Sequence, residues 1–204
     1  MPDLSFEAEL GHLVAGLDES GRGPWAGPVV AAAVVLDPGA VPEGMDDSKK
    51  LPPGRRARLC AEILAVAAVG IGRASVEEID AMNISQATAL AMRRALAALP
   101  VTPRHALIDG AWVPSGLGCP ASAVVGGDGR CLSVAAASIV AKVTRDRLMT
   151  GLARDFPGYG WERNAGYGVL AHAEALKRLG LTPHHRRSFR PIHKMLMEES
   201  GIRL

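Results

Sequence analysis

Two adjacent carboxylates, Asp18 and Glu19, close an apolar run at residues 13–17 and lead directly into the glycine turn Gly-Arg-Gly-Pro at 21–24. Hard divalent cations prefer oxygen ligands. Glycine lets the backbone approach a ligand closely, because no Cβ stands in the way. The pattern is therefore suited to holding a metal ion beside a phosphate group. Taken alone, the pair is equally compatible with a tight turn that carries two solvated acids.

Two further apolar segments also run into an acid. Ile108 is followed by Asp109, and Val125 leads through two glycines to Asp128. Ligands of open α/β sheets sit beyond the carboxyl ends of the strands, so Asp18 and Asp109 would meet if the first and fourth strands are neighbours. Clustered carboxylates repel one another unless cations neutralise them, and Mg²⁺ or Mn²⁺ suits an all-oxygen set. Three such strand ends favour a metal-dependent phosphoryl-transfer site over three structural acids.

A basic segment lies near the C-terminus, where no acid occurs between Glu174 and Glu198. Three histidines, at 184, 185 and 193, add hydrogen-bond donors to this stretch. Such a run is either an ordinary solvated face or a surface that contacts the phosphate backbone of a nucleic acid. The sequence leaves both readings open. The six cations of the segment are Lys177, Arg178, Arg186, Arg187, Arg190 and Lys194.

Other candidate sites are weaker. The glycines at 21–27 have the spacing G-x-G-x-x-x-G, and Pro28 opens a strand rather than a helix, which argues against a dinucleotide fingerprint. Asp146 lies in a helical stretch between cations and is expected to be an ion-pair partner. His172 is expected to pack or cap rather than to bind a metal. Ser138 lacks the His-Asp context of a serine hydrolase.

Composition limits the class of protein. The 204 residues predict one domain, and 48% hydrophobic content with only 4% aromatic residues predicts a core of Ala, Val and Leu. No apolar run reaches the roughly 20 residues that a membrane span needs, and the N-terminus lacks the pattern of a secretory signal. The three cysteines form no CxxC pair, so a zinc ribbon or a disulfide framework is not indicated. We expect a cytoplasmic monomer.

The strands that must position these acids are short and apolar. Strands are predicted at 11–17 and 28–36, as antiparallel neighbours covered on both faces, and at 70–74, 105–108 and 121–125. A helix is predicted over 55–69. Ser75 with Glu78, and Asn83 with Gln86, have the spacing of capping boxes for the next two helices. Strands first and then alternating helix and strand predict an α/β domain with a mixed central sheet.

The C-terminal half is predicted to be mainly helical. Ser133 is expected to cap a long helix that runs toward Phe156, and a second helix is expected over 169–179. Gly180 is expected to end that helix in the left-handed conformation, and Pro191 to open a last helix at its first position.

Several longer blocks together resemble the bacterial ribonuclease HII family. They occur in family order and span nearly the whole chain. In this sequence they are Gly-Leu-Asp-Glu-Ser-Gly-Arg-Gly-Pro at 16–24, Asp-Ser-Lys-Lys-Leu at 47–51, Leu-Ile-Asp-Gly at 107–110, Gly-Asp at 127–128, Ala-Ala-Ser-Ile-Val-Ala-Lys-Val-Thr-Arg-Asp at 136–146 and His-His-Arg-Arg-Ser-Phe at 184–189.

The resemblance implies a ribonuclease H-like fold over residues 1–204, with a basic helical C-terminal part from about 157. It implies that four acids hold two divalent ions, Mg²⁺ or Mn²⁺, and that the turn Gly21-Arg22-Gly23 contacts the ribose 2′-hydroxyl. Tyr167 would recognise the junction with DNA. Gly126, Asn164 and Ala165 depart from residues common in the family. The four acids are Asp18, Glu19, Asp109 and Asp128.

The resemblance also implies the activity. The expected protein is an endoribonuclease that cuts RNA paired with DNA and single ribonucleotides embedded in duplex DNA, on the 5′ side of the ribonucleotide, leaving 5′-phosphate and 3′-hydroxyl ends. Lys49, Arg186 and Arg187 are expected to add substrate contacts. The alternatives from other classes are a non-catalytic nucleic-acid-binding module with a structural metal and a small-molecule phosphatase.

Overall fold

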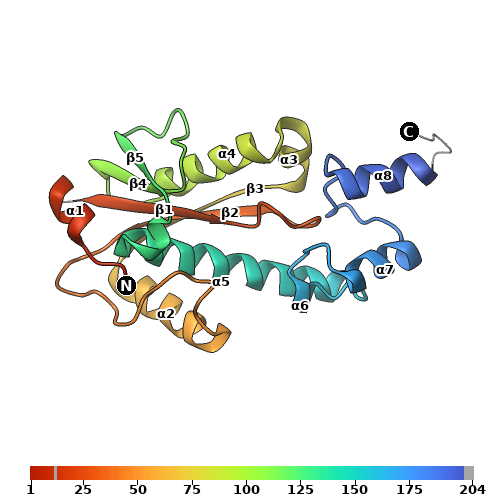
Figure 1. The fold of residues 1–204 in the computed structure, drawn as a ribbon, viewed down its shortest axis with the longest axis horizontal. Helices are drawn as coiled ribbons and strands as arrows, with labels where there is room; N and C mark the ends of the chain where they lie inside the picture. The colour runs from red at the N-terminus through yellow and green to blue at the C-terminus, as the bar shows by residue number, and fades with distance from the viewer. Residues whose placement is uncertain (12, 200–204) are drawn as a thin grey trace.

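The computed structural model describes residues 1–11 and 13–199, and within them a five-stranded sheet forms the centre of the molecule (Figure 1). The strand order is β3-β2-β1-β4-β5. The pairs β1–β2 and β2–β3 are antiparallel, whereas β1–β4 and β4–β5 are parallel, so the sheet is mixed as predicted. The strands are β1 Val14–Ser20, β2 Val29–Val35, β3 Ala68–Ala74, β4 His105–Asp109 and β5 Ala121–Val124.

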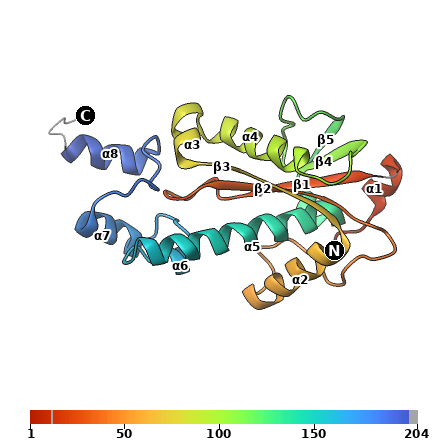
Figure 2. The same cartoon turned by 180° about the vertical axis from the view of Figure 1, so that it is seen from behind.

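Helices cover both faces of the sheet. Figures 1 and 2 show α3 and α4 on one face, α2 and α5 on the other, and α6 to α8 beyond one end of the sheet. The helices are α1 Ser5–Leu10, α2 Pro53–Val66, α3 Val76–Met82, α4 Ile84–Ala97, α5 Leu132–Asp155, α6 Trp161–Asn164, α7 Leu170–Leu179 and α8 Arg190–Glu199, and a 3₁₀ turn, η1, spans Gly127–Gly129.

The core is built from small aliphatic side chains on both faces of β1 and β2. Ala15 and Leu17 of β1 pack toward α3 and α4, whereas Ala32 and Val34 of β2 pack toward α2 and α5. Gly16 lies where α5 crosses β1, and a Cβ there would lie 2.1 Å from a backbone carbon of Ser133. The long helix therefore rests directly on the strand that carries the first two acids.

Most predicted elements are confirmed within a few residues, and the departures have physical causes. β1 continues through Ser20, so Asp18 and Glu19 lie inside the strand rather than beyond it. Ser133 is not the cap of α5. The helix starts after Cys131, and the backbone N–H and Oγ of Ser133 both donate to Oε1 of Glu7 in α1, an element that was not predicted.

At the ends of the other helices, the predicted caps are confirmed only in part. The Ser75–Glu78 capping box is present. Asn83 accepts hydrogen bonds from the backbone N–H groups of Ser85 and Gln86, but it does so at a φ of 74°. Gly180 also has a positive φ, 74°, but its ψ of −165° places it outside the left-handed helical region. Pro191 occupies the second position of α8 rather than the first.

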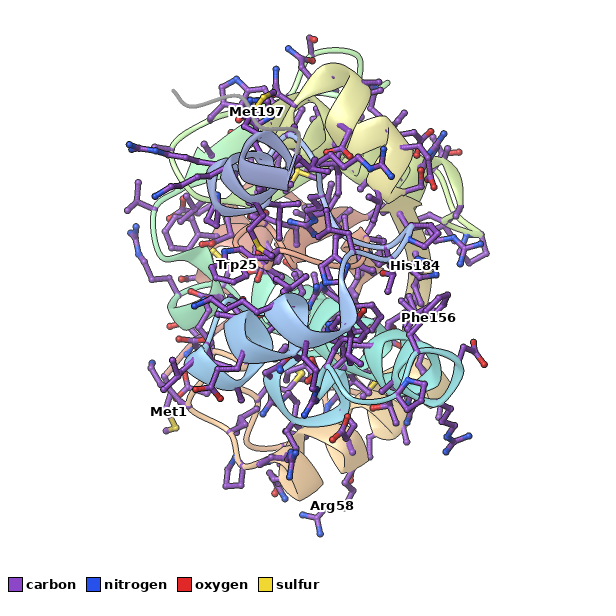
Figure 3. The ribbon with its side chains drawn as sticks, turned by 90° about the vertical axis from the view of Figure 1, so that its right-hand side faces the viewer. Met1, Trp25, Arg58, Phe156, His184 and Met197 are labelled. Carbon is purple, nitrogen blue, oxygen red and sulfur yellow. The ribbon has the colours of Figure 1, made fainter. Side chains whose placement is uncertain are left out.

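The part of the chain beyond α5 has a hydrophobic cluster of its own. Met149 near the end of α5 packs with Trp161, Leu176 and Ile192. In Figure 3, which faces this end of the molecule, Phe156 and His184 lie side by side, with ring centroids 4.9 Å apart. α5 ends at Asp155. The division of the chain into a single catalytic domain with a basic helical part from about 157 stays a prediction. None of the described helices is long and apolar enough to cross a membrane.

Candidate metal centre and the adjoining glycine turn

Three carboxylates from three separate segments converge at one edge of the sheet. Asp18, Asp109 and Asp128 each offer an oxygen atom, and these atoms all lie within 4.8 Å of one another. Leu17 pairs with Ile108 in the parallel β1–β4 ladder, so the next residue on each strand emerges at the same edge. Asp128 arrives from η1, which follows β5 beside β4. The expected meeting of Asp18 and Asp109 is confirmed.

The electrostatics of this cluster favour a bound cation. Burial raises the pKa of Asp18 well above its ordinary value, and the charges of Glu19 and Asp109 raise it further. Burial also raises the pKa of Asp128, and the charges of Asp109 and Asp47 add to the effect. Because burial and like charge both penalise the ionised carboxylates, a divalent cation bound among them would relieve that penalty. The all-oxygen donor set fits a hard ion such as Mg²⁺ or Mn²⁺.

Glu19 lies next to this cluster but is not one of the three converging acids. Successive side chains of a strand point to opposite faces, and Glu19 instead has an oxygen 3.7 Å from a guanidinium nitrogen of Arg22. Burial raises the pKa of Glu19, Arg22 opposes the rise, and Asp109 adds to it. Its predicted role as a fourth metal ligand stays a prediction.

Lys49 approaches the cluster from the loop before α2. Its Nζ lies 3.7 Å from Oδ2 of Asp128, and its side chain is 78% exposed. The neighbouring Ser48 is buried and accepts a hydrogen bond of 2.8 Å from Oγ of Ser138 on α5. Ser138 therefore anchors the Lys49 loop rather than forming part of a hydrolase triad.

The glycine turn after β1 lies between a buried arginine and an exposed tyrosine. Gly21 has a φ of +100°, and a Cβ there would lie 2.0 Å from Nε of Arg145. A Cβ at Gly23 would lie 3.5 Å from Cε1 of Tyr167, whose side chain is half-exposed. The turn and Tyr167 thus form one continuous surface, while Arg145 fills the space beneath.

The basic segment divides into a buried and an exposed part. Arg186 was predicted to contact phosphates, but it is fully buried and donates to the backbone carbonyls of Gly21, Arg22 and Gly27. The prediction of a surface cation at this position is therefore wrong. Arg187 is exposed, and its backbone N–H donates to Asp80. Its contact with phosphates stays a prediction.

Sequence reasoning missed Arg145, which appeared only inside a family block. It has no exposed surface and lies in the middle of α5, where its type and position predict an ordinary helical cation. Its nearest sequence signal is indirect: Gly21 must be glycine both for its φ and because Arg145 lies against it. That signal can be interpreted only once the two segments are known to touch.

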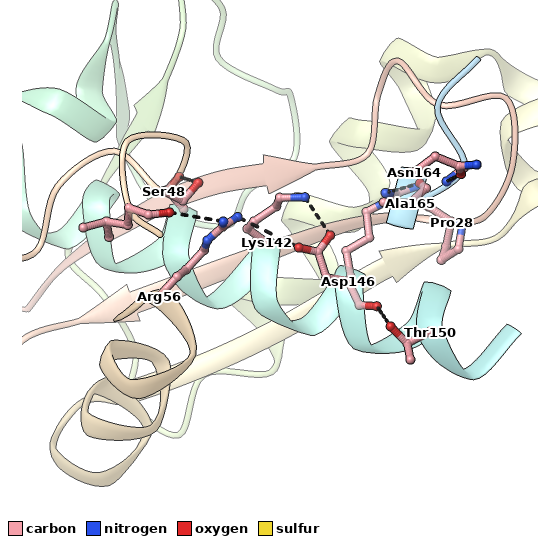
Figure 4. Close-up of polar contacts among 12 residues, drawn as sticks. Pro28, Ser48, Arg56, Lys142, Asp146, Thr150, Asn164 and Ala165 are labelled. Carbon is pink, nitrogen blue, oxygen red and sulfur yellow. Dashed lines mark hydrogen bonds and ion pairs between the residues drawn. The ribbon is translucent and has the colours of Figure 1, made fainter. Parts of the chain in front are cut away.

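Two residues were expected to be structural, and both are. His172 is buried and accepts a hydrogen bond from Nε1 of Trp161 at 3.1 Å. Asp146 has its Oδ1 2.6 Å from Nζ of Lys142, and its Oδ2 lies 3.9 Å from a guanidinium nitrogen of Arg56. Dashed lines mark both ion pairs in Figure 4. Neither residue belongs to the acid cluster.

Comparison with known proteins decides the family. The sequence profile described as Ribonuclease HII matches residues 15–194. The Ribonuclease HII of Jannaschia sp. strain CCS1 is 64% identical over 195 residues, which cover 96% of this chain and 98% of that protein. The chain belongs to the ribonuclease HII family. Its members are nucleases, so the expectation of an endonuclease of the ribonuclease H type is confirmed.

Solved structures agree with the fold. The ribonuclease H2 of Pyrococcus horikoshii OT3 superposes with a TM-score of 0.75 at 29% identity, over 91% of this chain and 97% of that one. A second structure, that of Bst-RNase HIII in complex with Mn²⁺, has a TM-score of 0.73 at 22% identity, over 98% of this chain and 75% of that one, which supports the fold alone. The ribonuclease H-like fold is thereby confirmed, and a metal-dependent reaction accords with both the family and the acid cluster.

Proposed function

We propose that this ribonuclease HII family member hydrolyses the RNA strand of RNA–DNA hybrids and cuts on the 5′ side of single ribonucleotides embedded in duplex DNA. The observation that carries the proposal is the convergence of Asp18, Asp109 and Asp128 within 4.8 Å beside the glycine turn and Tyr167. The acids supply a site for phosphodiester chemistry. The adjoining turn supplies backbone groups close to where a ribose would lie.

We assign a role to each acidic side chain and to Lys49 from its position in the site. The three clustered aspartates, joined by Glu19 when it turns away from Arg22, hold two divalent ions, Mg²⁺ or Mn²⁺. Bound there, such ions activate water and stabilise the leaving oxygen of an in-line displacement. The products carry 5′-phosphate and 3′-hydroxyl ends. Lys49, whose Nζ lies 3.7 Å from Oδ2 of Asp128, is assigned a contact with the substrate phosphate.

Recognition of the ribonucleotide is assigned to the turn and the tyrosine. The 2′-hydroxyl distinguishes RNA from DNA, and the backbone at Gly21, Arg22 and Gly23 can approach it closely. Tyr167 presents a half-exposed ring next to Gly23, where it can pack on a sugar or a base at the junction. Exposed cations such as Arg187 would contact phosphates without reading the base sequence. We further propose that the protein acts as a monomer in the cytoplasm.

The deciding experiment uses the purified full chain with three duplexes of one sequence: all-DNA, DNA with a single ribonucleotide, and a continuous RNA–DNA hybrid. In Mg²⁺ or Mn²⁺ we expect cleavage of the last two, with the cut mapped to the 5′ side of the ribonucleotide, and no cleavage in EDTA. Binding without cleavage in any metal would instead indicate the non-catalytic module. Hydrolysis of a small phosphate ester with no duplex cleavage would indicate the phosphatase.

A further inference from the structure

We propose that Arg145 and Arg186 are positioning residues for ribonucleotide recognition, because they hold the glycine turn in a fixed position relative to Tyr167. Both side chains are fully buried, and within residues 1–11 and 13–199 neither forms an ion pair with the clustered aspartates. The inference rests on the proposed function, and it adds a specificity role for two buried side chains that lie outside the acid cluster and the substrate-facing surface.

Arg186 ties both ends of the turn segment together. Its Nη2 donates to the carbonyl of Gly21 at 2.6 Å and its Nη1 to that of Arg22 at 2.8 Å. Its Nε donates to the carbonyl of Gly27 at 2.9 Å, at the far end of the segment. The backbone N–H of Arg186 also donates to the carbonyl of Trp25 at 2.8 Å. One side chain thus sets the shape of residues 21–27.

Arg145 joins that segment to the one that carries Tyr167. Its Nε donates to the carbonyl of Pro28 at 3.0 Å, and its Nη2 to that of Ala26 at 3.1 Å. Its Nη1 donates at 2.9 Å to the carbonyl of Ala165, two residues before Tyr167. Pro28 and Ala165, labelled in Figure 4, lie close together beside α5.

The backbone just before Tyr167 is constrained by its own conformation and by further hydrogen bonds. Ala165 has a φ of 47° and Gly166 one of 81°, so the backbone before Tyr167 makes a sharp left-handed turn. The N–H of Trp25 donates to the carbonyl of Gly166 at 2.8 Å, which links the two segments a second time. Asn164 supports this turn, since its side chain accepts from the N–H of Gly166 and donates to the carbonyl of Tyr159.

The burial of the two guanidinium groups supports the same role. Both guanidinium groups are fully buried, and among the described residues neither forms a salt bridge with a carboxylate. A buried charge is costly unless it is well hydrogen-bonded, and here backbone carbonyls supply the acceptors. Arginine suits this role because its rigid planar fork presents five donors that are spread apart, whereas the three donors of a lysine ammonium group radiate from one nitrogen.

The expected consequence is selective. A misplaced turn can still engage one of many neighbouring 2′-hydroxyls in a continuous hybrid, whereas a duplex with one ribonucleotide offers a single 2′-hydroxyl. Misplacements of about 1 Å can cost about 100-fold in rate. Loss of either arginine should therefore reduce cleavage at a single ribonucleotide more than cleavage of a hybrid.

The test compares Arg145→Lys and Arg186→Lys with wild type by the ratio of kcat/KM on the single-ribonucleotide duplex to kcat/KM on the hybrid. A smaller folded fraction lowers both rates equally and leaves this ratio unchanged. We expect the ratio to fall at least about tenfold in each variant. The matched control is Arg94→Lys, because Arg94 donates to the carbonyl of Arg73 and pairs with Glu78 on α3, away from the turn. Its ratio should match wild type.

A double variant tests the mechanism. If Arg186 acts by aligning the turn with Tyr167, Arg186→Lys should lower the ratio little further in a Tyr167→Ala background, since residues that act together are not additive. Unchanged ratios in both lysine variants, or a fully additive loss in the double variant, would overturn the inference while leaving the proposed function intact. Failure of the wild type to cut the single-ribonucleotide duplex would overturn both.

Discussion

The acid cluster and the layer formed by Arg145 and Arg186 are close neighbours that hold buried charge in opposite ways. In the cluster, like charges face one another, and burial together with that repulsion raises the pKa of Asp18 and of Asp128. In the arginine layer, burial lowers the pKa of Arg145 to about 10 and that of Arg186 to about 9. Six hydrogen bonds to carbonyls nevertheless satisfy the two groups.

The difference separates a binding site from a framework. The arginine layer is complete without any ligand, because the protein's own backbone supplies its acceptors. The acid cluster is under electrostatic strain that a bound divalent cation would relieve. The stability of the protein should therefore rise with the concentration of such a cation. Changes to the two regions should therefore have different signatures.

The largest effect is expected at the cluster. Asp109→Asn removes a carboxylate whose charge raises the pKa of both Asp18 and Asp128. The substitution should lower kcat by more than about 100-fold in Mg²⁺. In metal-free buffer the melting temperature should stay the same or rise, because repulsion is reduced. Wild type, but not the variant, should be clearly stabilised when Mg²⁺ is added. Asp155→Asn, at the exposed end of α5, is the control, and wild-type cleavage by Asp109→Asn would refute the carboxylate site.

The second effect concerns the free energy of unfolding and two buried histidines, His172 and His185, whose rings lie within hydrogen-bond distance of each other. Burial favours the neutral form of both rings. His185 is buried, which lowers its pKa to about 4, and nearby His172 also has a lowered pKa. Nδ1 of His185 accepts from the N–H of Thr182 at 3.0 Å, so a proton there would break that bond. Protonation therefore favours the unfolded chain.

The direction of the pH dependence follows from the pKa of His185, which is 6.5 in the unfolded chain and about 4 in the folded protein. The stability that neutral His185 contributes is fully present above pH 6.5 and is lost progressively as the pH falls toward 4. The loss should approach about 3 kcal/mol. Urea unfolding of wild type at pH 7.5 and pH 5 measures the part of this loss that occurs above pH 5, about 2 kcal/mol. His185→Gln should flatten the dependence, whereas His193→Gln, at an exposed position, should not. Equal slopes in all three proteins would show that His185 does not control acid stability.

A smaller effect is expected where the framework meets the substrate. Tyr167→Ala should lower the ratio of kcat/KM on a single-ribonucleotide duplex to kcat/KM on a hybrid by about tenfold, because a stacking contact contributes about 1–3 kcal/mol. Leu64→Ala, an exposed apolar residue on α2, should leave the ratio unchanged. Equal losses on both substrates would assign Tyr167 to general binding.

The smallest effect is expected on the exposed side of the basic segment. Arg187→Ala should weaken hybrid binding about equally for all base sequences and reduce the slope of log Kd against log salt concentration by about 1. Arg58→Ala, on the exposed face of α2, is the matched control. An unchanged slope in Arg187→Ala would mean that this part of the segment is an ordinary solvated face, in contrast to its buried neighbour Arg186.

Much of the site was predictable because its acids are marked locally. Asp18 and Asp109 each follow an apolar run, and the parallel pairing of β1 with β4 supplies the condition on which their meeting depended. The sheet and most helices followed from the same hydrophobic periodicity. The ends of elements were less predictable, since Ser133 bonds to Glu7, 126 positions away in the sequence.

The sequence by itself therefore determined the family, the positions of the clustered aspartates along the chain and most of the strands and helices, because these depend on residue type and short-range pattern. Tertiary structure alone decided which cations face solvent and which are buried: Arg186 and Arg187 are adjacent and identical in type, yet one binds three backbone carbonyls and the other is exposed. It also decided that Glu19 pairs with Arg22 while Asp18 joins the cluster. The physical reason is that burial depends on segments far apart in the sequence, since Arg186 bonds to carbonyls more than 100 positions away, and no local pattern records such contacts.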